Sequence, residues 1–192
     1  MSIKEYYETN EQYGNRYDTD FQHIGVTFYR EFSGIMDKQA RFIEENQLFN
    51  EDDWELFVHQ FEIAADDVDD GWRGEYWGKM MRGACFTYSV TRDEKLYRVL
   101  AETCRDMLTA QDELGRISTY SVESEFDGWD MWGRKYVLLG MEYFLEICND
   151  EKQKERIISS MCKQLDYIIS KIGDAKEGKL PVTSATRHWR GL

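Results

Sequence analysis

Residues 127–147 have the sequence DGWDMWGRKYVLLGMEYFLEI, in which apolar and aromatic side chains cover nearly every side of the predicted helix. A helix of this kind is buried on several sides, so we expect this segment to lie at the centre of the fold. Residues 151–172 instead carry one apolar stripe opposite charged and amide side chains, which is typical of an outer helix. The short polar turn between the two segments predicts antiparallel neighbours.

An earlier segment, residues 74–115, shows the same succession of inner helix, short turn and outer helix as residues 129–173. Several residues recur in the same order at nearly constant separations, which predicts an internal repeat. The matched pairs are Trp77 and Trp132, 55 residues apart, Asp93 and Asp150, 57 apart, Glu94 and Glu151, 57 apart, and Gly115 and Gly173, 58 apart. A third copy opens at residues 187–191 and stops at Leu192, so we expect the sequence to be part of a longer repeat.

This alternation predicts an all-α fold of α/α-hairpin repeats arranged as a partial (α/α)6 toroid, and an α-solenoid shares the same building block. Apolar spacing also predicts helices over residues 24–43 and 50–64. Residues 1–22 show no clear period. The predicted domains are therefore an N-terminal arm at 1–22 and an incomplete toroid at 23–192.

The formal net charge of −13 argues against nucleic acid and against an anionic membrane surface as partners, because both are negatively charged. No apolar run approaches the roughly 20 residues that cross a bilayer, and the first 17 residues lack the apolar core of a signal peptide, so we expect a cytoplasmic protein. The histidines show no metal-ligand spacing, and no metal site is predicted. The four cysteines lie inside predicted helices without a Cys-x-x-Cys pair, which predicts buried free thiols.

Two acidic residues, Glu75 and Asp130, stand at the starts of the two predicted inner helices. There they face the positive end of the helix dipole, and capping alone would explain them. The alternative is that both point into a central cavity and bind sugar hydroxyls. Asp127 and Trp129 belong to the long loop at residues 116–129, and loops of this length commonly build binding clefts.

Part of the sequence resembles glycoside hydrolase family 127, the β-L-arabinofuranosidase-like proteins. The resemblance covers about residues 70–192 and rests on GEYWGK at 74–79, DGWDMWGRKY at 127–136, LLG at 138–140 and HWRGL at 188–192. It implies an (α/α)6 barrel followed by β-domains, and removal of arabinofuranose from glycans by a zinc-bound cysteine nucleophile with a glutamate acid/base. The cysteines of this chain do not match that cluster, so no catalytic residue is assigned, and zinc is expected in a full-length relative rather than here. Trp129 stands where some members have a sugar-binding histidine.

The leading hypothesis is an N-terminal portion of such a glycosidase-like protein, inactive by itself, which binds carbohydrate through Glu75, Asp127, Trp129, Asp130 and His188. An incomplete ring leaves an apolar edge, so self-association or a protein partner is also expected. One alternative is a non-catalytic helical repeat scaffold that binds protein. Another is a different toroid enzyme, an unsaturated-uronide hydrolase or lyase, with Asp127 or Asp130 as its acid.

Overall fold

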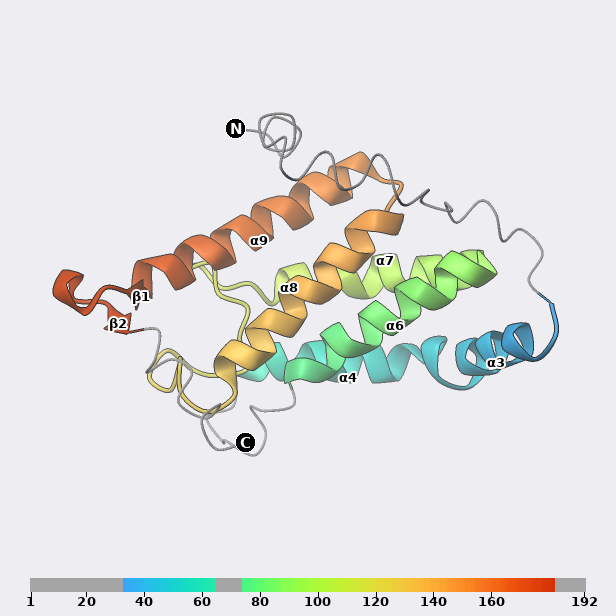
Figure 1. The fold of residues 1–192 in the computed structure, drawn as a ribbon, viewed down its shortest axis with the longest axis horizontal. Helices are drawn as coiled ribbons and strands as arrows, with labels where there is room; N and C mark the ends of the chain where they lie inside the picture. The colour runs from blue at the N-terminus through green and yellow to red at the C-terminus, as the bar shows by residue number, and fades with distance from the viewer. Residues whose placement is uncertain (1–32, 65–73, 182–192) are drawn as a thin grey trace, which may run out of the picture. The chain divides into compact units, whose positions relative to one another are not determined.

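The computed structural model describes residues 33–64 and 74–181, which are mostly helical (Figure 1). The helices are α3 (Ile35–Ile43), the π-helical η2 (Glu44–Leu48), α4 (Glu51–Ile63), α6 (Glu75–Thr91), α7 (Glu94–Thr109), α8 (Asp130–Ile147), α9 (Glu151–Lys171) and the short 3-10 helix η4 (Ala175–Glu177). Two short strands, β1 (Ile172–Gly173) and β2 (Leu180–Pro181), pair in parallel. The all-α class is thus confirmed in its general form. The predicted arm, the first part of the helix at 24–43, and the opening of a third copy lie outside the described residues.

The two hairpins α6–α7 and α8–α9 begin their second helices with the same cap. The side chain of Asp93 accepts hydrogen bonds from the backbone N–H groups two and three residues further on, at 2.8 and 3.3 Å. Asp150 does the same at 2.9 and 3.2 Å. Each carboxylate satisfies two N–H groups that the first turn of a helix leaves unpaired. The recurring aspartates therefore have one structural role in both hairpins.

The inner helices α6 and α8 are in direct backbone contact through glycine. A Cβ atom added at Gly78 would lie 1.9 Å from the carbonyl oxygen of Tyr136. One added at Gly140 would lie 2.8 Å from the ring of Trp77 and 3.0 Å from the Cα of Gly78. Because no side chain separates the helices at this point, they approach more closely than helices that pack through larger residues.

The inner helices run in the same direction. Gly74 at the start of α6 lies beside Gly133 near the start of α8, and the Phe86 ring near the end of α6 lies 5.1 Å from the Tyr143 ring. The N-terminal ends of α6 and α8 consequently meet at the same side of the molecule.

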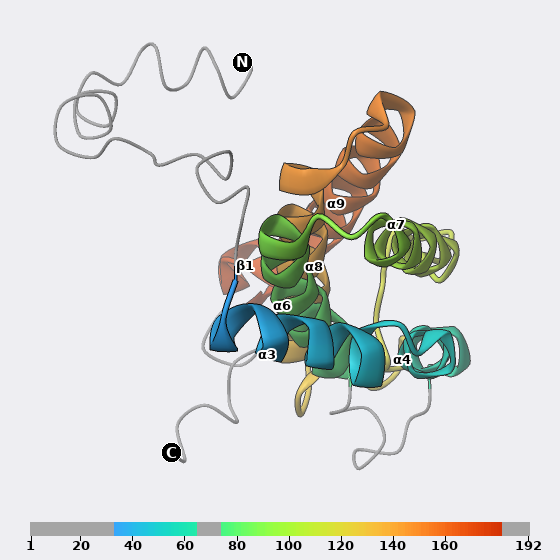
Figure 2. The ribbon, with the colours of Figure 1, turned by 90° about the vertical axis from the view of Figure 1, so that its right-hand side faces the viewer.

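The outer helices also run parallel to one another, and α4 contacts α7 as α7 contacts α9 (Figure 2). Lys95 at the start of α7 has its Nζ 4.3 Å from the ring centre of Phe49, just before α4. Tyr97 at the start of α7 accepts a 3.1 Å hydrogen bond from the backbone N–H of Asn149, just before α9. Further along, Gln111 donates a 2.9 Å hydrogen bond to the carbonyl oxygen of Ser160. We call α6 and α8 the inner pair, and α4, α7 and α9 the outer row.

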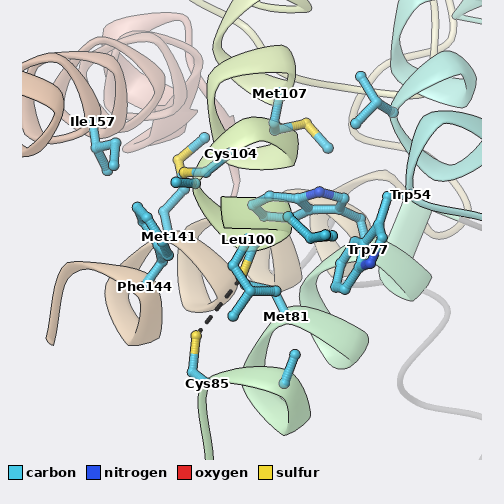
Figure 3. Packing of buried hydrophobic residues seen from close by; sticks show 14 of the residues in the cluster. Trp54, Trp77, Met81, Cys85, Leu100, Cys104, Met107, Met141, Phe144 and Ile157 are labelled. Atoms are coloured by element: carbon cyan, nitrogen blue, oxygen red, sulfur yellow. Dashed lines mark hydrogen bonds between the residues drawn. The ribbon is translucent and has the colours of Figure 1, made fainter. Parts of the chain in front are cut away.

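The apolar core lies between the inner pair and the outer row (Figure 3). Trp77 is completely buried, and its indole N–H donates a 3.0 Å hydrogen bond to the hydroxyl of Thr103. Trp132, its partner in the sequence repeat, is only half-buried and lies outside this core. Buried residues of α6 instead match buried residues of α8 when the two helices are aligned 56 residues apart. The matching pairs are Met81 and Val137, Cys85 and Met141, and Tyr88 and Phe144. The two tryptophans are therefore not equivalent.

Much of the segment between α7 and α8 is buried, whereas the sequence predicted an open loop that could build a binding cleft. Residues 115–120 are buried, and Ile117 belongs to the core. Gly115 has a φ of 91°, a conformation that favours glycine and turns the chain inward after α7. The pairing of β1 with β2 after α9 was not predicted, because two-residue strands carry no sequence periodicity.

The described residues bear on the predictions for the cysteines and for membrane-spanning helices. All four cysteines are free, but Cys162 is exposed while Cys85, Cys104 and Cys148 are buried, so the prediction of four buried thiols is wrong for one. Cys162 lies on the side of α9 that faces away from the core. None of the described helices is both long and apolar enough to cross a membrane.

We expect Gly78→Ala to lower the free energy of unfolding by about 3 kcal/mol or more, because the methyl group must push α6 and α8 apart. Gly83→Ala, in the same helix, has nothing within 4 Å of the added carbon and should stabilise the protein by about 0.5–1 kcal/mol. Urea denaturation of both variants measures the difference. Equal effects of the two substitutions would contradict the backbone contact.

Candidate functional site

A row of aromatic side chains follows the exposed side of α8. Trp129, Trp132, Tyr136 and Tyr143 recur at helical spacing and are all half-buried. The Trp132 ring centre is 6.3 Å from that of Trp129 and 5.0 Å from that of Tyr136, in edge-to-face arrangements. We call Trp129, Trp132 and Tyr136 the aromatic row, and it begins where the inner helices start.

Two lysines and one glutamate surround the aromatic row. Lys135 Nζ is 3.7 Å from the ring centre of Trp132 and 4.1 Å from that of Tyr136, which are cation–π distances. Lys79 Nζ, on α6, is 5.0 Å from the ring centre of Tyr136 and 2.9 Å from a carboxylate oxygen of Glu75. Glu75 also accepts a hydrogen bond from the indole N–H of Trp132. Glu75 therefore holds the row against α6.

Asp130 has a different environment, because it is buried beneath the loop. Its carboxylate accepts 2.9 and 3.0 Å hydrogen bonds from Nε of Arg134, a 2.8 Å hydrogen bond from the backbone N–H of Phe126, and one from the hydroxyl of Ser118. A buried carboxylate with an ion pair and several donors is fully satisfied. Asp130 thus fixes the loop to the start of α8 and does not reach the surface.

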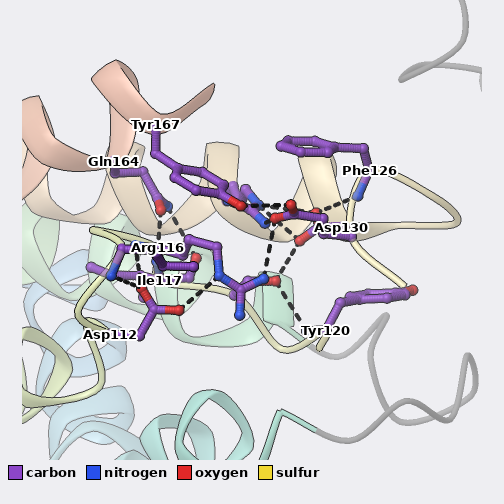
Figure 4. Close-up of polar contacts among 12 residues, drawn as sticks. Asp112, Arg116, Ile117, Tyr120, Phe126, Asp130, Gln164 and Tyr167 are labelled. Carbon is purple, nitrogen blue, oxygen red and sulfur yellow. Dashed lines mark hydrogen bonds and ion pairs between the residues drawn. The ribbon is translucent and has the colours of Figure 1, made fainter. Parts of the chain in front are cut away.

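The same loop is held by a second group of buried charges (Figure 4). Glu125 accepts hydrogen bonds from Arg134 at 3.0 Å, Arg116 at 3.1 Å and the hydroxyl of Tyr167 at 2.6 Å. Arg116 Nε also donates a 2.7 Å hydrogen bond to Asp112. We call this set, together with Asp130, the loop network.

The side-chain amide of Gln164, on α9, holds the backbone of the loop on both sides of one residue. It accepts a 2.6 Å hydrogen bond from the N–H of Ile117 and donates a 3.0 Å hydrogen bond to its carbonyl oxygen. Gln164 is completely buried, and this pairing satisfies both ends of its amide. The Gln164 amide thereby binds the N–H and C=O of one loop residue, as a neighbouring β-strand would, and joins the loop to α9.

The loop network shifts the pKa of two of its members. Burial, together with the hydrogen bond to Glu125, raises the pKa of Tyr167 from its ordinary value of 10.0 to about 12. Burial by itself would lower the pKa of Arg116, but the hydrogen bonds to Asp112 and Glu125 outweigh it and raise that pKa. Both shifts favour the protonated forms, which make the hydrogen bonds of the network.

The structure brings only part of the predicted site together. Glu75 and Trp129 both lie beside Trp132, and Asp127 is exposed on the loop, where its carboxylate accepts a 2.9 Å hydrogen bond from the N–H of Gly128. Asp130 belongs to the loop network, and His188 lies outside the described residues. Lys79, Lys135 and Tyr136 were not among the predicted site residues, although Tyr136 stands four residues after Trp132 and thus on its helix face.

Within residues 33–64 and 74–181, no three or more histidine, cysteine or acidic side chains are grouped so as to hold a metal ion. The thiols of Cys85 and Cys104 are also poor nucleophiles, because burial raises the pKa of both, that of Cys85 to about 12.

Comparisons with family models, with curated proteins and with solved structures find no match. The resemblance to glycoside hydrolase family 127 therefore stays a prediction.

Because Tyr167 belongs to the loop network, the free energy of unfolding should fall as the pH rises through the alkaline range. Because its pKa is raised in the folded state, its contribution is complete below about pH 10 and is lost as the pH rises toward 12. We expect Tyr167→Phe to cost about 1.5–3 kcal/mol at neutral pH and to show a shallower loss of stability between pH 10 and 12 than the unmodified protein. Urea denaturation at pH 8, 10 and 11 provides the comparison, and equal slopes would count against this assignment.

Proposed function

We propose that this chain is the N-terminal portion of a glycoside-hydrolase-like α/α toroid and that the aromatic row forms one wall of its carbohydrate site. The alternation of inner and outer helices supports the toroid, because successive inner helices run parallel and successive outer helices do so too. In such a ring the exposed side of α6 and α8 faces the central opening. The aromatic row lies on that side.

The aromatic row is the observation that carries the proposal. Three half-buried rings lie within 5.0–6.3 Å of their neighbours at one end of the inner helices. The C–H-rich faces of sugar rings pack on such surfaces, and a few fixed polar groups then orient the ligand. Glu75, Asp127, Lys79 and Lys135 are the polar groups available for sugar hydroxyls.

The proposed role is binding rather than catalysis. Glycoside hydrolysis generally uses two carboxyl groups that flank the scissile bond. Glu75 is engaged by Lys79 and Trp132, and Asp130 is buried in the loop network. The burial of Asp130 also weakens the alternative in which a uronide-processing enzyme uses it as an acid. The zinc-bound cysteine implied by the resemblance is assigned to a longer relative.

The proposal predicts that Trp132→Ala weakens binding of an arabinofuranose-containing oligosaccharide by about tenfold or more, or about 1.4 kcal/mol. Phe42→Ala removes an aromatic ring of α3 that is 60% exposed and distant in sequence, and it should leave the affinity unchanged. Titration followed by the NMR signals of the tryptophan indole N–H groups measures both. If the oligosaccharide shifts no indole signal at millimolar concentration, the carbohydrate proposal fails.

A second candidate, a helical scaffold that binds protein, is favoured by a separate observation. Three apolar residues of α9 are 43–61% exposed: Ile158, Leu165 and Ile169. Exposed apolar surfaces of this kind mark protein interfaces. The two functions are compatible, because these residues belong to α9 whereas the aromatic row belongs to α8 and its first turn.

A further inference from the structure

A groove between η2 and α6 lies beside the aromatic row. Its volume of about 510 Å³ falls within the range of about 300–1,000 Å³ that is usual for small-molecule pockets. Leu48 and Ala84 in its lining are buried, and the ring of Phe57 from α4 meets that of Tyr76 edge to face at 5.8 Å. We call this hollow the η2–α6 groove.

Lys79 joins the η2–α6 groove to the aromatic row. It lines the groove, and its Nζ is 5.0 Å from the ring centre of Tyr136 and 6.0 Å from that of Trp132. Gly83 stands one turn further along α6 and lines the groove as well. A Cβ atom added at Gly83 would meet nothing within 4 Å, so the groove is open there. A ligand that extends from the aromatic row past Lys79 would therefore enter the groove.

The lining of the η2–α6 groove combines apolar surface with a few polar groups. Tyr76 and Met80 supply apolar surface. The side-chain N–H of Gln47 donates a 3.8 Å hydrogen bond to the sulfur of Met80, which is a weak acceptor that a sugar hydroxyl can replace. The hydroxyl of Thr87 donates a 3.1 Å hydrogen bond to the carbonyl oxygen of Gly83, and its oxygen can accept another. Pockets for small molecules commonly have this composition.

The side of the groove formed by η2 has an uncommon backbone. The N–H of Phe49 donates a 2.9 Å hydrogen bond to the carbonyl oxygen of Glu44, five residues earlier. Such π-helical turns are rare and occur frequently at functional sites. The buried carboxylate of Glu44 accepts hydrogen bonds from Arg41, at 3.1 Å, and from the hydroxyl of Thr91 at the end of α6. The turn that carries Gln47 is thereby fixed to α6.

We propose that the η2–α6 groove binds the sugar unit that follows the one on the aromatic row, so that the site takes an oligosaccharide rather than a single sugar. This inference rests on the carbohydrate role proposed for the aromatic row and adds the length of the ligand. The occupant follows from continuity, because Lys79 belongs to both surfaces. Its ammonium group would contact hydroxyl groups next to the bond between the two sugar units.

Affinities for ligands of increasing length test the groove. The unmodified protein should bind an arabinofuranose trisaccharide at least about tenfold more tightly than methyl arabinofuranoside, because the added units contact the groove. Gly83→Leu fills the open part of the groove with a residue that favours helix, and it should retain less than about threefold of this gain. Ser159→Leu, at an exposed position of α9, should keep the whole gain. NMR titration measures the affinities, and urea denaturation verifies that both variants are folded.

The unmodified protein provides a second readout. The signals of the Gly83 backbone N–H and of the Gln47 side-chain amide should shift with the trisaccharide but not with methyl arabinofuranoside. Equal affinity for both ligands, or a gain that Gly83→Leu retains in full, would overturn the groove proposal while the aromatic row still binds sugar. If neither ligand shifts a tryptophan indole signal, the carbohydrate proposal fails and this inference fails with it.

Discussion

The crossing of α6 and α8 is a contact between two backbones, and the positions of the other elements depend on it. Gly78 faces the carbonyl oxygen of Tyr136, and Gly140 faces both Gly78 and the ring of Trp77. With the inner helices this close, Trp77 fills the space beneath them and reaches Thr103 of α7. The outer helices then pack against α6 and α8 as one closely packed pair rather than against two separate helices. The parallel start of both inner helices gathers the aromatic row and Glu75 at one end.

The loop before α8 is held by buried charges as well as by the apolar packing of Ile117 and Phe126. Arg116 and Arg134 both donate to Glu125, and Arg134 also pairs with Asp130. Removal of one member of a buried pair leaves an uncompensated charge, so such networks favour one conformation over others. Here the network fixes the position of Trp129 and the residues before it. The position of the aromatic row therefore depends on the loop network.

Residue patterns were sufficient to place α4, α6, α7, α8 and α9. The sequence showed that Asp93 and Asp150 recur before an apolar stripe, but their capping role was not predicted, although capping acts locally. The difference between Trp77 and Trp132 could not be predicted, because a one-residue difference in register turns a side chain by about 100° and exchanges core for surface. Asp130 could be assigned to a helix start, but its burial depends on Ser118 and Phe126 of a loop without periodicity. The contact of Lys79 was missed for a similar reason, since its cation–π contact with Tyr136 joins α6 to α8.

The arrangement of the other helices depends on the contact of α6 with α8 through Gly78 and Gly140. NMR spectroscopy measures this contact directly, through nuclear Overhauser effects between the α-protons of the two glycines in isotopically labelled protein. We expect a clear cross-peak between them, together with contacts from the Gly140 α-protons to the indole of Trp77. Absence of both, in a folded protein whose other helix contacts are visible, would contradict the arrangement from which the aromatic row and the outer row follow.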